Sequence, residues 1–251
     1  MMFGTGTWAI VHRLRDRIGH GSIQTVFKSV FSNECECEIM RIGIYGGSFN
    51  PVHFAHLILA ESCREQLALD RVVFVPSAEP PNKRGQRLAP TEARFDMLTL
   101  AIGGREEFEV SRVEMDRSGP SWTVETLKQL REYYAATRPD SETSLFLLGG
   151  ADMFADLPRW YCISEILQLA IPVGVRRPGY PIPDVTPFTP FVTPRRLRQM
   201  AMCSVEMPQM ELSASDIRQR LGDGRSIRYR TPIAVERFIY EHQLYAKNDA
   251  R

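Results

Sequence analysis

The stretch GIYGGSFNPVHFAHLILAE, residues 43–61, decides the fold that we expect for this chain. The apolar run over 41–46 is typical of a buried strand, and apolar residues recur at helical spacing over 54–68. Between these runs stand paired glycines, which permit a tight turn, and Asn50 before a proline, which is a plausible N-cap for the helix that follows. The stretch therefore predicts a strand, a glycine loop and a helix.

The same alternation of strand and helix continues along the chain. Further strands are expected over 71–77, 108–115, 144–150 and 170–179. Further helices are expected over 91–102, 122–135, 213–224 and 233–245. Strands separated by helices of this length indicate βαβ units and a parallel sheet with helices on both faces. The predicted class is α/β, a Rossmann-like doubly wound parallel sheet with a small C-terminal helical subdomain.

Composition indicates a soluble globular protein. The chain has 251 residues, of which 43% are hydrophobic and 24% charged, and its formal net charge is +1. Such a balance argues against binding of nucleic acid by bulk charge, and arginines, prolines or acids interrupt every apolar run before it reaches membrane-spanning length. Five cysteines, an odd number, fit reduced thiols, so we expect a cytoplasmic protein.

The chain is expected to carry one main domain with short additions. Residues 1–39 are mildly basic and amphipathic and then turn acidic, which favours an N-terminal extension that is disordered or not native. The main domain would cover 40–246, with its C-terminal helical part at about 194–246 after a proline-rich loop. Residues 247–251 would form a tail.

Two histidines at the start of the first helix suggest a phosphate site. In a doubly wound sheet, ligands bind beyond the carboxyl ends of the strands, where helix N-termini attract anions. His53 and His56 would lie on one face of the first turn, close to the loop of Gly46 and Gly47. Imidazoles placed there can donate hydrogen bonds to phosphate oxygens and follow charge as it moves between them.

Other interpretations of these residues are weaker. The glycine spacing does not fit GxGxxG, which argues against a nicotinamide-dependent dehydrogenase, and GxxxxGK[ST] is absent from the sequence. The histidine pair lacks HExxH, and Cys35 and Cys37 have no supporting second pair, so no protein metal site is predicted. Taken alone, the two histidines are also compatible with capping or packing.

Several ordered motifs resemble those of one family. They are GGSFNPVHFAH (46–56), FVPSAEPPNK (74–83), RFDMLTLAI (94–102), RSGPSWTVETLKQL (117–130), LLGGADMFADLPRWYCISEIL (147–167), VRRPGY (175–180) and the segment 212–245 that begins LSASDIRQRL. Together they are similar to bacterial nicotinate mononucleotide adenylyltransferase, of the nucleotidyltransferase superfamily. The resemblance runs from about Met40 to Tyr245. The departures from its motifs are Asn50, Ala55, Asn82, Trp122 and the pair Ala214 and Ser215.

The resemblance implies a reaction and roles for particular residues. AMP would pass from ATP to nicotinate mononucleotide in NAD biosynthesis, giving nicotinate adenine dinucleotide and pyrophosphate, with Mg²⁺ held through the ATP phosphates and water. The catalytic residues would be His53, His56 and Arg218. ATP would be bound by Gly46, Gly47, Ser48, Phe49, Ser213, Ser215 and Asp152. Nicotinate mononucleotide would be bound by Thr123, Trp160, Tyr161, Lys83 and Arg177.

Two alternatives stay open at this point. A sister adenylyltransferase would use nicotinamide mononucleotide in place of the acid, whereas SWTVETL (121–127) and LPRWY (157–161) argue against one that uses pantetheine phosphate. A nucleotide-binding regulatory module would keep the fold and lack catalysis, an idea that the departures at Asn50, Ala55 and Asn82 motivate. ATP and nicotinate mononucleotide are the expected partners, with no nucleic acid or membrane, and assembly into a homo-oligomer is left open.

Overall fold

The computed structural model describes residues 39–80, 88–176 and 183–246, and its centre is a five-stranded parallel sheet. The strand order is β3-β2-β1-β4-β5, and a separate pair of parallel strands, β6 and β7, lies beside it. The strands are β1 (Ile39–Gly47), β2 (Arg71–Pro76), β3 (Phe108–Val110), β4 (Glu142–Leu148), β5 (Ala170–Pro172), β6 (Gly174–Arg176) and β7 (Ser204–Glu206). This confirms the predicted α/β class with a parallel sheet.

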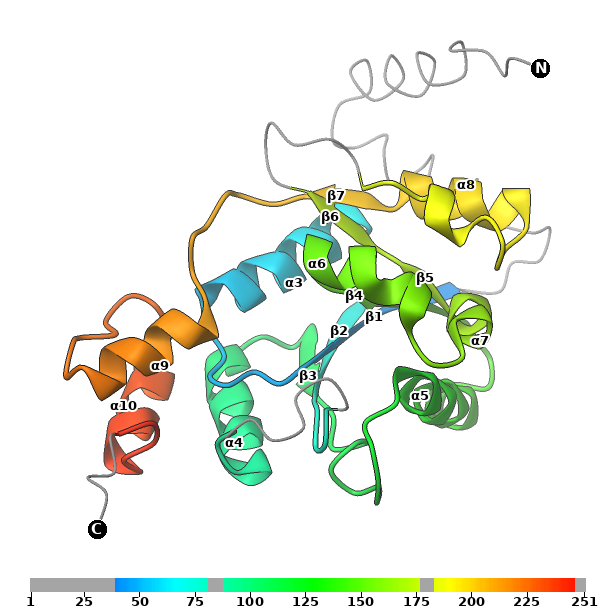
Figure 1. Cartoon of the computed structure of the whole chain (residues 1–251). Helices are drawn as coiled ribbons and strands as arrows, with labels where there is room; N and C mark the ends of the chain where they lie inside the picture. The colour runs from blue at the N-terminus through cyan, green and yellow to red at the C-terminus, as the bar shows by residue number, and fades with distance from the viewer. Residues whose placement is uncertain (1–38, 81–87, 177–182, 247–251) are drawn as a thin grey trace. The chain divides into compact units, whose positions relative to one another are not determined.

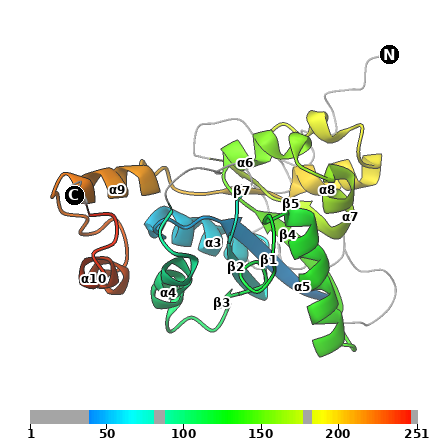
Figure 2. The same ribbon diagram turned by 60° about the horizontal axis from the view of Figure 1, so that its bottom comes forward.

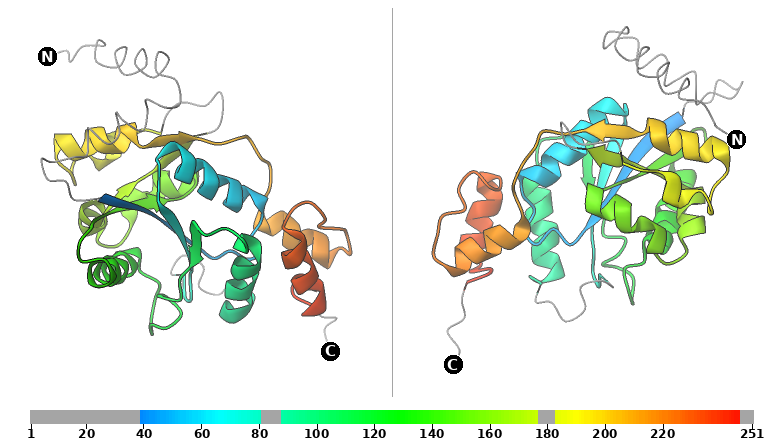
Figure 3. Two further views of the ribbon diagram at one scale, coloured as in Figure 1. Left: turned by 180° about the vertical axis from the view of Figure 1, so that it is seen from behind. Right: turned by 45° about the horizontal axis from the view of Figure 1, so that its top comes forward.

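Helices cover both faces of the sheet. They are α3 (Phe54–Gln66), α4 (Thr91–Ile102), α5 (Thr123–Thr137), α6 (Ala151–Asp156), α7 (Ile163–Leu169), α8 (Pro194–Met202), α9 (Ala214–Gly222) and α10 (Ile233–Glu241), with short 3₁₀ turns at Leu157–Arg159 and Thr186–Phe188. Helices α3 and α4 lie on one side of the sheet, and α5 and α7 on the other (Figures 1 and 3). This arrangement follows from right-handed crossovers that run in opposite directions from the centre of the sheet.

The central strands are apolar because both of their faces are covered. Ile42 and Ile44 of β1 are almost fully buried, as are residues 145–148 of β4. Gly43 lets these two strands and their neighbours pack closely, because a Cβ there would meet Leu148 Cδ1 at 2.7 Å. The register pairs Tyr45 with Leu148, so the carboxyl ends of β1 and β4 lie side by side.

The segment predicted as one strand over 170–179 divides into two. β5 pairs with β4 in the main sheet, whereas β6 pairs with β7 in the second sheet. The turn falls at Val173, whose amide donates to Leu147 O at 2.9 Å. The three-residue strand β7 was not predicted, since so short a run carries little periodicity.

The strand predicted over 108–115 is also shorter than expected. β3 ends at Val110, and the chain then turns, with the amides of Met115 and Asp116 donating to Arg112 O at 2.7 and 2.9 Å. β3 lies at the edge of the sheet, so its second side offers no strand to extend the pairing.

Helices α9 and α10 lie beside α4 and the start of α3 (Figure 2). The Phe54 amide donates to Arg230 O at 3.2 Å, and Thr231 Oγ1 donates to Val52 O at 2.8 Å. These bonds attach the C-terminal helices to the loop that follows β1. Within the part of the chain that the structure describes, no helix combines the length and the apolar character needed to cross a membrane.

Candidate active site

The sheet order reverses between β1 and β4, which is where a ligand crevice forms in this type of fold. Gly46 and Gly47, expected in a loop, are the last residues of β1 and pair with Val75 and Pro76 of β2. The segment 46–50, which links the end of β1 to the turn before α3, is called the glycine loop below. A Cβ at Gly46 would meet nothing within 4 Å, so the backbone is open on that side. Neither Gly46 nor Gly47 has positive φ, although paired glycines were expected to permit a tight turn here. The residue with a left-handed backbone conformation in this segment is Phe49, at φ 42°. The Phe49 ring is buried, and its centroid lies 5.3 Å from that of the Tyr45 ring. This packing holds the segment in that conformation.

His53 and His56 meet at the start of α3. His53 is the N-cap of this helix, so the expectation that Asn50 caps it is wrong. The two rings stack with centroids 3.7 Å apart, at an interplanar angle of 22°. His56 Nδ1 accepts a hydrogen bond from the His53 main-chain amide at 3.2 Å. That acceptor role assigns the proton of a neutral His56 ring to Nε2.

Burial keeps His53 uncharged. Its side chain is 5% exposed, and desolvation lowers its pKa to about 4, only partly opposed by a backbone hydrogen bond. Its Nδ1 atom is buried and has no hydrogen-bond partner among the described residues. At neutral pH this ring can therefore both donate and accept a hydrogen bond, and it does not repel a charge on the neighbouring His56.

Helix α9 brings a cation to the same loop. Arg218 Nη1 donates to Asn50 O at 2.8 Å, and Nη2 donates to Ser215 Oγ at 3.2 Å. Ser213 is the N-cap of α9, and its Oγ accepts from the Asp216 amide at 3.1 Å. Two helix N-termini and one guanidinium thus adjoin the glycine loop, an arrangement that suits a polyanion.

The first turns of these two helices differ in charge. The first turn of α3 carries no acidic residue, so its positive end is not offset. In α9 the acidic Asp216 occupies the first turn, but Arg230 Nη1 pairs with its Oδ2 at 2.9 Å. The electrostatic balance at both helix starts therefore remains favourable to an anion.

Aromatic residues gather at the start of α5. Trp122 is the N-cap of this helix and Thr123 its first residue. The Tyr161 ring lies 4.9 Å from the Trp122 ring at 40°, and 56% of Tyr161 is exposed. Trp160 is held separately, because its Nε1 donates to Asp156 Oδ2 at 3.2 Å. The structure thus pairs Tyr161 with Trp122, which presents an exposed flat surface beside the Thr123 backbone.

Of the three other predicted site residues, the structure describes only Asp152. Asp152 is exposed in the first turn of α6, just beyond β4, where Gly150 is the N-cap. Lys83 and Arg177 lie outside the described residues. Across the described ranges, no group of three or more histidine, cysteine or acidic side chains could hold a metal ion.

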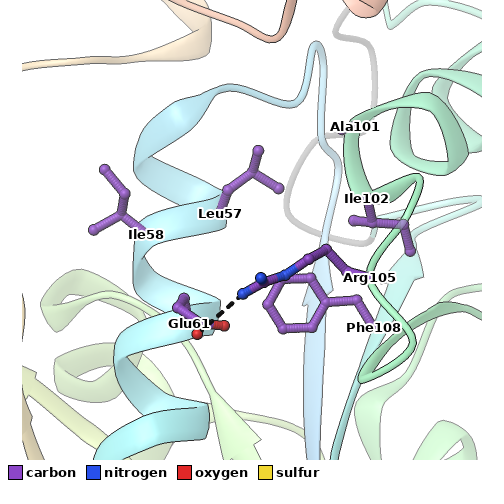
Figure 4. Close-up of a pocket in the computed structure, with 7 residues that line it drawn as sticks. All are labelled: Leu57, Ile58, Glu61, Ala101, Ile102, Arg105 and Phe108. Atoms are coloured by element: carbon purple, nitrogen blue, oxygen red, sulfur yellow. Dashed lines mark ion pairs between the residues drawn. The ribbon is translucent and has the colours of Figure 1, made fainter.

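Two surface hollows are lined by residues other than the predicted site residues, although Leu57 in the first directly follows His56 and Phe54 in the second directly follows His53. One, of about 250 Å³, lies between α3 and α4, where Arg105 Nη2 and Glu61 Oε1 form an ion pair at 3.2 Å (Figure 4). The other, of about 580 Å³, is lined by Phe54, Arg228, Tyr229, Thr231, Ile233, Glu236, Arg237 and Tyr240. None of the residues that we assign to substrates lines either hollow.

Comparison with known proteins identifies the family. A model of the cytidylyltransferase-like family matches residues 44–220. A probable nicotinate-nucleotide adenylyltransferase of Thermus thermophilus is 42% identical over 207 residues, which are 82% of this chain and 100% of the relative. One from Roseiflexus castenholzii is 40% identical over 205 residues, covering 82% of this chain and 98% of the relative. The chain belongs to the nicotinate-nucleotide adenylyltransferase family.

Solved structures agree with this fold. The nicotinic acid mononucleotide adenylyltransferase of Plasmodium falciparum, complexed with NaAD, is similar with a TM-score of 0.61 at 17% identity, covering 82% of this chain and 97% of that one. A putative nicotinate-nucleotide adenylyltransferase from Vibrio parahaemolyticus gives a TM-score of 0.55 at 21% identity, covering 82% of this chain and 95% of that one. At such identities these likenesses concern the fold.

For a member of the nicotinate-nucleotide adenylyltransferase family, sequence reasoning missed two features of the site. Trp122 was noted only as a departure from a motif, although its place before Thr123 could have pointed to the ring surface. Asn50 was read as a cap, yet its Oδ1 accepts from the Ala89 amide at 3.0 Å and from the Tyr245 hydroxyl at 2.8 Å. Those partners are 39 and 195 residues away, beyond any local pattern.

Proposed function

We propose that this chain transfers AMP from ATP to nicotinate mononucleotide, forming nicotinate adenine dinucleotide and pyrophosphate in NAD biosynthesis. Membership of the nicotinate-nucleotide adenylyltransferase family supports the reaction. The observation that carries the proposal is the meeting of the stacked His53 and His56 with Arg218 at the glycine loop. This arrangement places hydrogen-bond donors where the negatively charged phosphates of the two substrates would have to meet.

The reaction needs little covalent chemistry from the protein. An oxygen of the nicotinate mononucleotide phosphate attacks the α-phosphorus of ATP, a new P–O bond forms, and the bond to the bridging oxygen breaks to release pyrophosphate. The nucleophile comes with the substrate, so the protein aligns two anions and offsets developing charge. Alignment of this kind can contribute about 7 to 11 kcal/mol to lowering the barrier.

The phosphate groups would be met by the residues around the glycine loop. His53 and His56 would donate to the triphosphate and the transition state, together with amides of residues 46–49. Arg218, Ser213 and Ser215 would hold the β and γ phosphates at the start of α9. Neutral His53 offers its proton without competing with His56 for charge, because its pKa is lowered to about 4.

The pyridine ring would lie near the start of α5. An aromatic face can stack on a planar heterocycle, and we assign this to Trp160 and Tyr161, with Trp122 now added because it contacts Tyr161. The Thr123 backbone and the Tyr161 hydroxyl would meet the carboxylate, which favours the acid over the amide.

The remaining contacts are assigned more simply. Asp152 would bond a ribose hydroxyl, and Lys83 and Arg177 would offset phosphate charge. Mg²⁺ would arrive with ATP and polarise its phosphates. Since no described cluster of three donors is available, phosphate oxygens and water would hold the ion.

We assign the activity to residues 40–246. Each site residue proposed above has a number in this range, and the Thermus thermophilus relative is matched over its whole length by 82% of this chain. Cys63, Cys162 and Cys203, within the described ranges, are free thiols, which supports a reducing, cytoplasmic setting.

The deciding experiment is pyrophosphate release by the purified chain with ATP and Mg²⁺, comparing nicotinate mononucleotide with nicotinamide mononucleotide. We expect strong preference for the acid. Equal use of both would keep the phosphate chemistry and discard the carboxylate site at Thr123 and Tyr161. If calorimetry shows nucleotide binding but no pyrophosphate is released, the chain is a regulatory nucleotide-binding module and not an enzyme.

A further inference from the structure

Among the described residues, Arg94, in the first turn of α4, is the largest side chain that is fully buried, at 1% exposure. All its described acceptors are neutral. Nη1 donates to Ser48 O at 2.9 Å and to Ser77 O at 2.8 Å. Nε donates to Ala89 O at 3.0 Å, and Nη2 to Thr91 Oγ1 at 2.9 Å.

These acceptors come from segments that meet behind the glycine loop. Ser48 belongs to that loop, Ser77 follows β2, and Ala89 precedes α4. Two further bonds join the same segments, from the Ser77 amide to Gly47 O at 2.9 Å and from the Ala89 amide to Asn50 Oδ1 at 3.0 Å. One guanidinium therefore fixes the glycine loop against the ends of two other elements.

The charge of Arg94 acts on one peptide group in particular. Ser48 O and the Phe49 amide belong to the same peptide unit, and a hydrogen bond to the oxygen polarises the amide into a stronger donor. Among the described residues, no carboxylate hydrogen-bonds the guanidinium. Burial lowers its pKa, while Tyr245 and Glu114 act on it only through weaker electrostatic attraction.

We propose that Arg94 is a positioning residue for the triphosphate of ATP, which orients the Ser48–Phe49 peptide group and strengthens its amide as a donor to phosphate. The inference rests on the proposed function, because the Phe49 amide is one of the groups that we assign to ATP. Arg94 itself touches no substrate, so its effect reaches ATP only through the loop.

The test uses Arg94→Lys, which keeps the charge and loses the planar fork of donors. Calorimetry with the ATP analogue that carries a methylene group between its α and β phosphorus atoms should show a Kd raised by about tenfold. The KM for ATP should rise in parallel, while the KM for nicotinate mononucleotide changes little. Thr91→Val, which removes one acceptor and leaves the guanidinium, should raise the Kd by roughly threefold and serves if the lysine variant does not fold.

Arg196→Lys is the matched control. Arg196 is half-buried, less so than Arg94, and donates through Nε to a main-chain carbonyl, Leu167 O at 3.0 Å, but none of its partners belongs to the site. We expect both Arg196→Lys and Arg94→Lys to lower the melting temperature. Arg196→Lys should leave the Kd for the analogue unchanged. An unchanged Kd in folded Arg94→Lys, or an equal rise in the control, would overturn the inference. Wild-type protein that binds the analogue without using nicotinate mononucleotide would refute the proposed function alone.

Discussion

At the scale of the residue, two adjacent imidazoles have separate tasks because their surroundings differ. His53 is buried and neutral, whereas His56 is half-buried and is oriented by a hydrogen bond to its Nδ1. We expect His56→Ala to lower kcat by about 10² or more, because it removes a preorganised donor to charge that moves during transfer. Steady-state pyrophosphate release measures this. The control is His242→Ala, which replaces an exposed histidine at the end of α10 and should retain normal turnover. A near-normal kcat in His56→Ala would contradict the assignment.

The buried His53 also makes stability depend on pH. Its pKa is about 4 in the folded protein and near the ordinary value of 6.5 when unfolded, so between these values the unfolded chain binds more protons. The free energy of unfolding should therefore fall as pH drops from about 6.5 towards 4, by up to about 3 kcal/mol, and stay unaffected by this group above pH 6.5. Urea unfolding across this range should show a shallower slope for His53→Gln than for the wild type. Equal slopes would contradict the prediction.

At the scale of the element, the sequence pattern predicted those helices and strands whose bounds depend on residues close by in the chain. The helix expected over 91–102 is α4, with the same bounds, because its apolar positions and the preceding proline lie within its own sequence. The end of β5 and the role of Asn50 depend on partners elsewhere in the chain. Val173 turns towards Leu147, and Asn50 bonds Ala89 and Tyr245, so neither could be read from neighbours along the chain.

The start of α9 combines capping with the proposed phosphate contact. Ser213→Ala should lower the free energy of unfolding by about 1 kcal/mol, since the Asp216 amide loses its acceptor. It should also raise the KM for ATP by about fivefold through loss of a hydroxyl donor. Chemical unfolding and initial rates measure the two effects.

Thr193→Ala removes an equivalent cap on α8, where the threonine Oγ1 accepts from the Arg196 amide at 3.3 Å. This control should lose similar stability and keep the KM for ATP. A KM that is unchanged in both variants would leave Ser213 as a cap and nothing more.

At the scale of the whole molecule, the site depends on contacts between distant parts of the chain. The main-chain oxygen of Asn50 accepts a hydrogen bond from Arg218, and its side-chain Oδ1 accepts one from Tyr245. These donors are 168 and 195 residues away in the sequence. The C-terminal helices are therefore fastened to the glycine loop from two directions. Folding of the C-terminal part and ordering of the phosphate site should then be one cooperative event.

Tyr245→Phe tests this coupling, because it removes only the hydroxyl that donates to Asn50 Oδ1 at 2.8 Å. We expect a loss of about 1 kcal/mol in the free energy of unfolding and about fivefold in kcat/KM for ATP, as the loop loses one of its anchors. The matched control is Tyr240→Phe, whose ring is 50% exposed on α10. Urea unfolding and pyrophosphate release should be normal in that variant. Full kcat/KM in a destabilised Tyr245→Phe would mean that the C-terminal part supports the fold without organising the phosphate site.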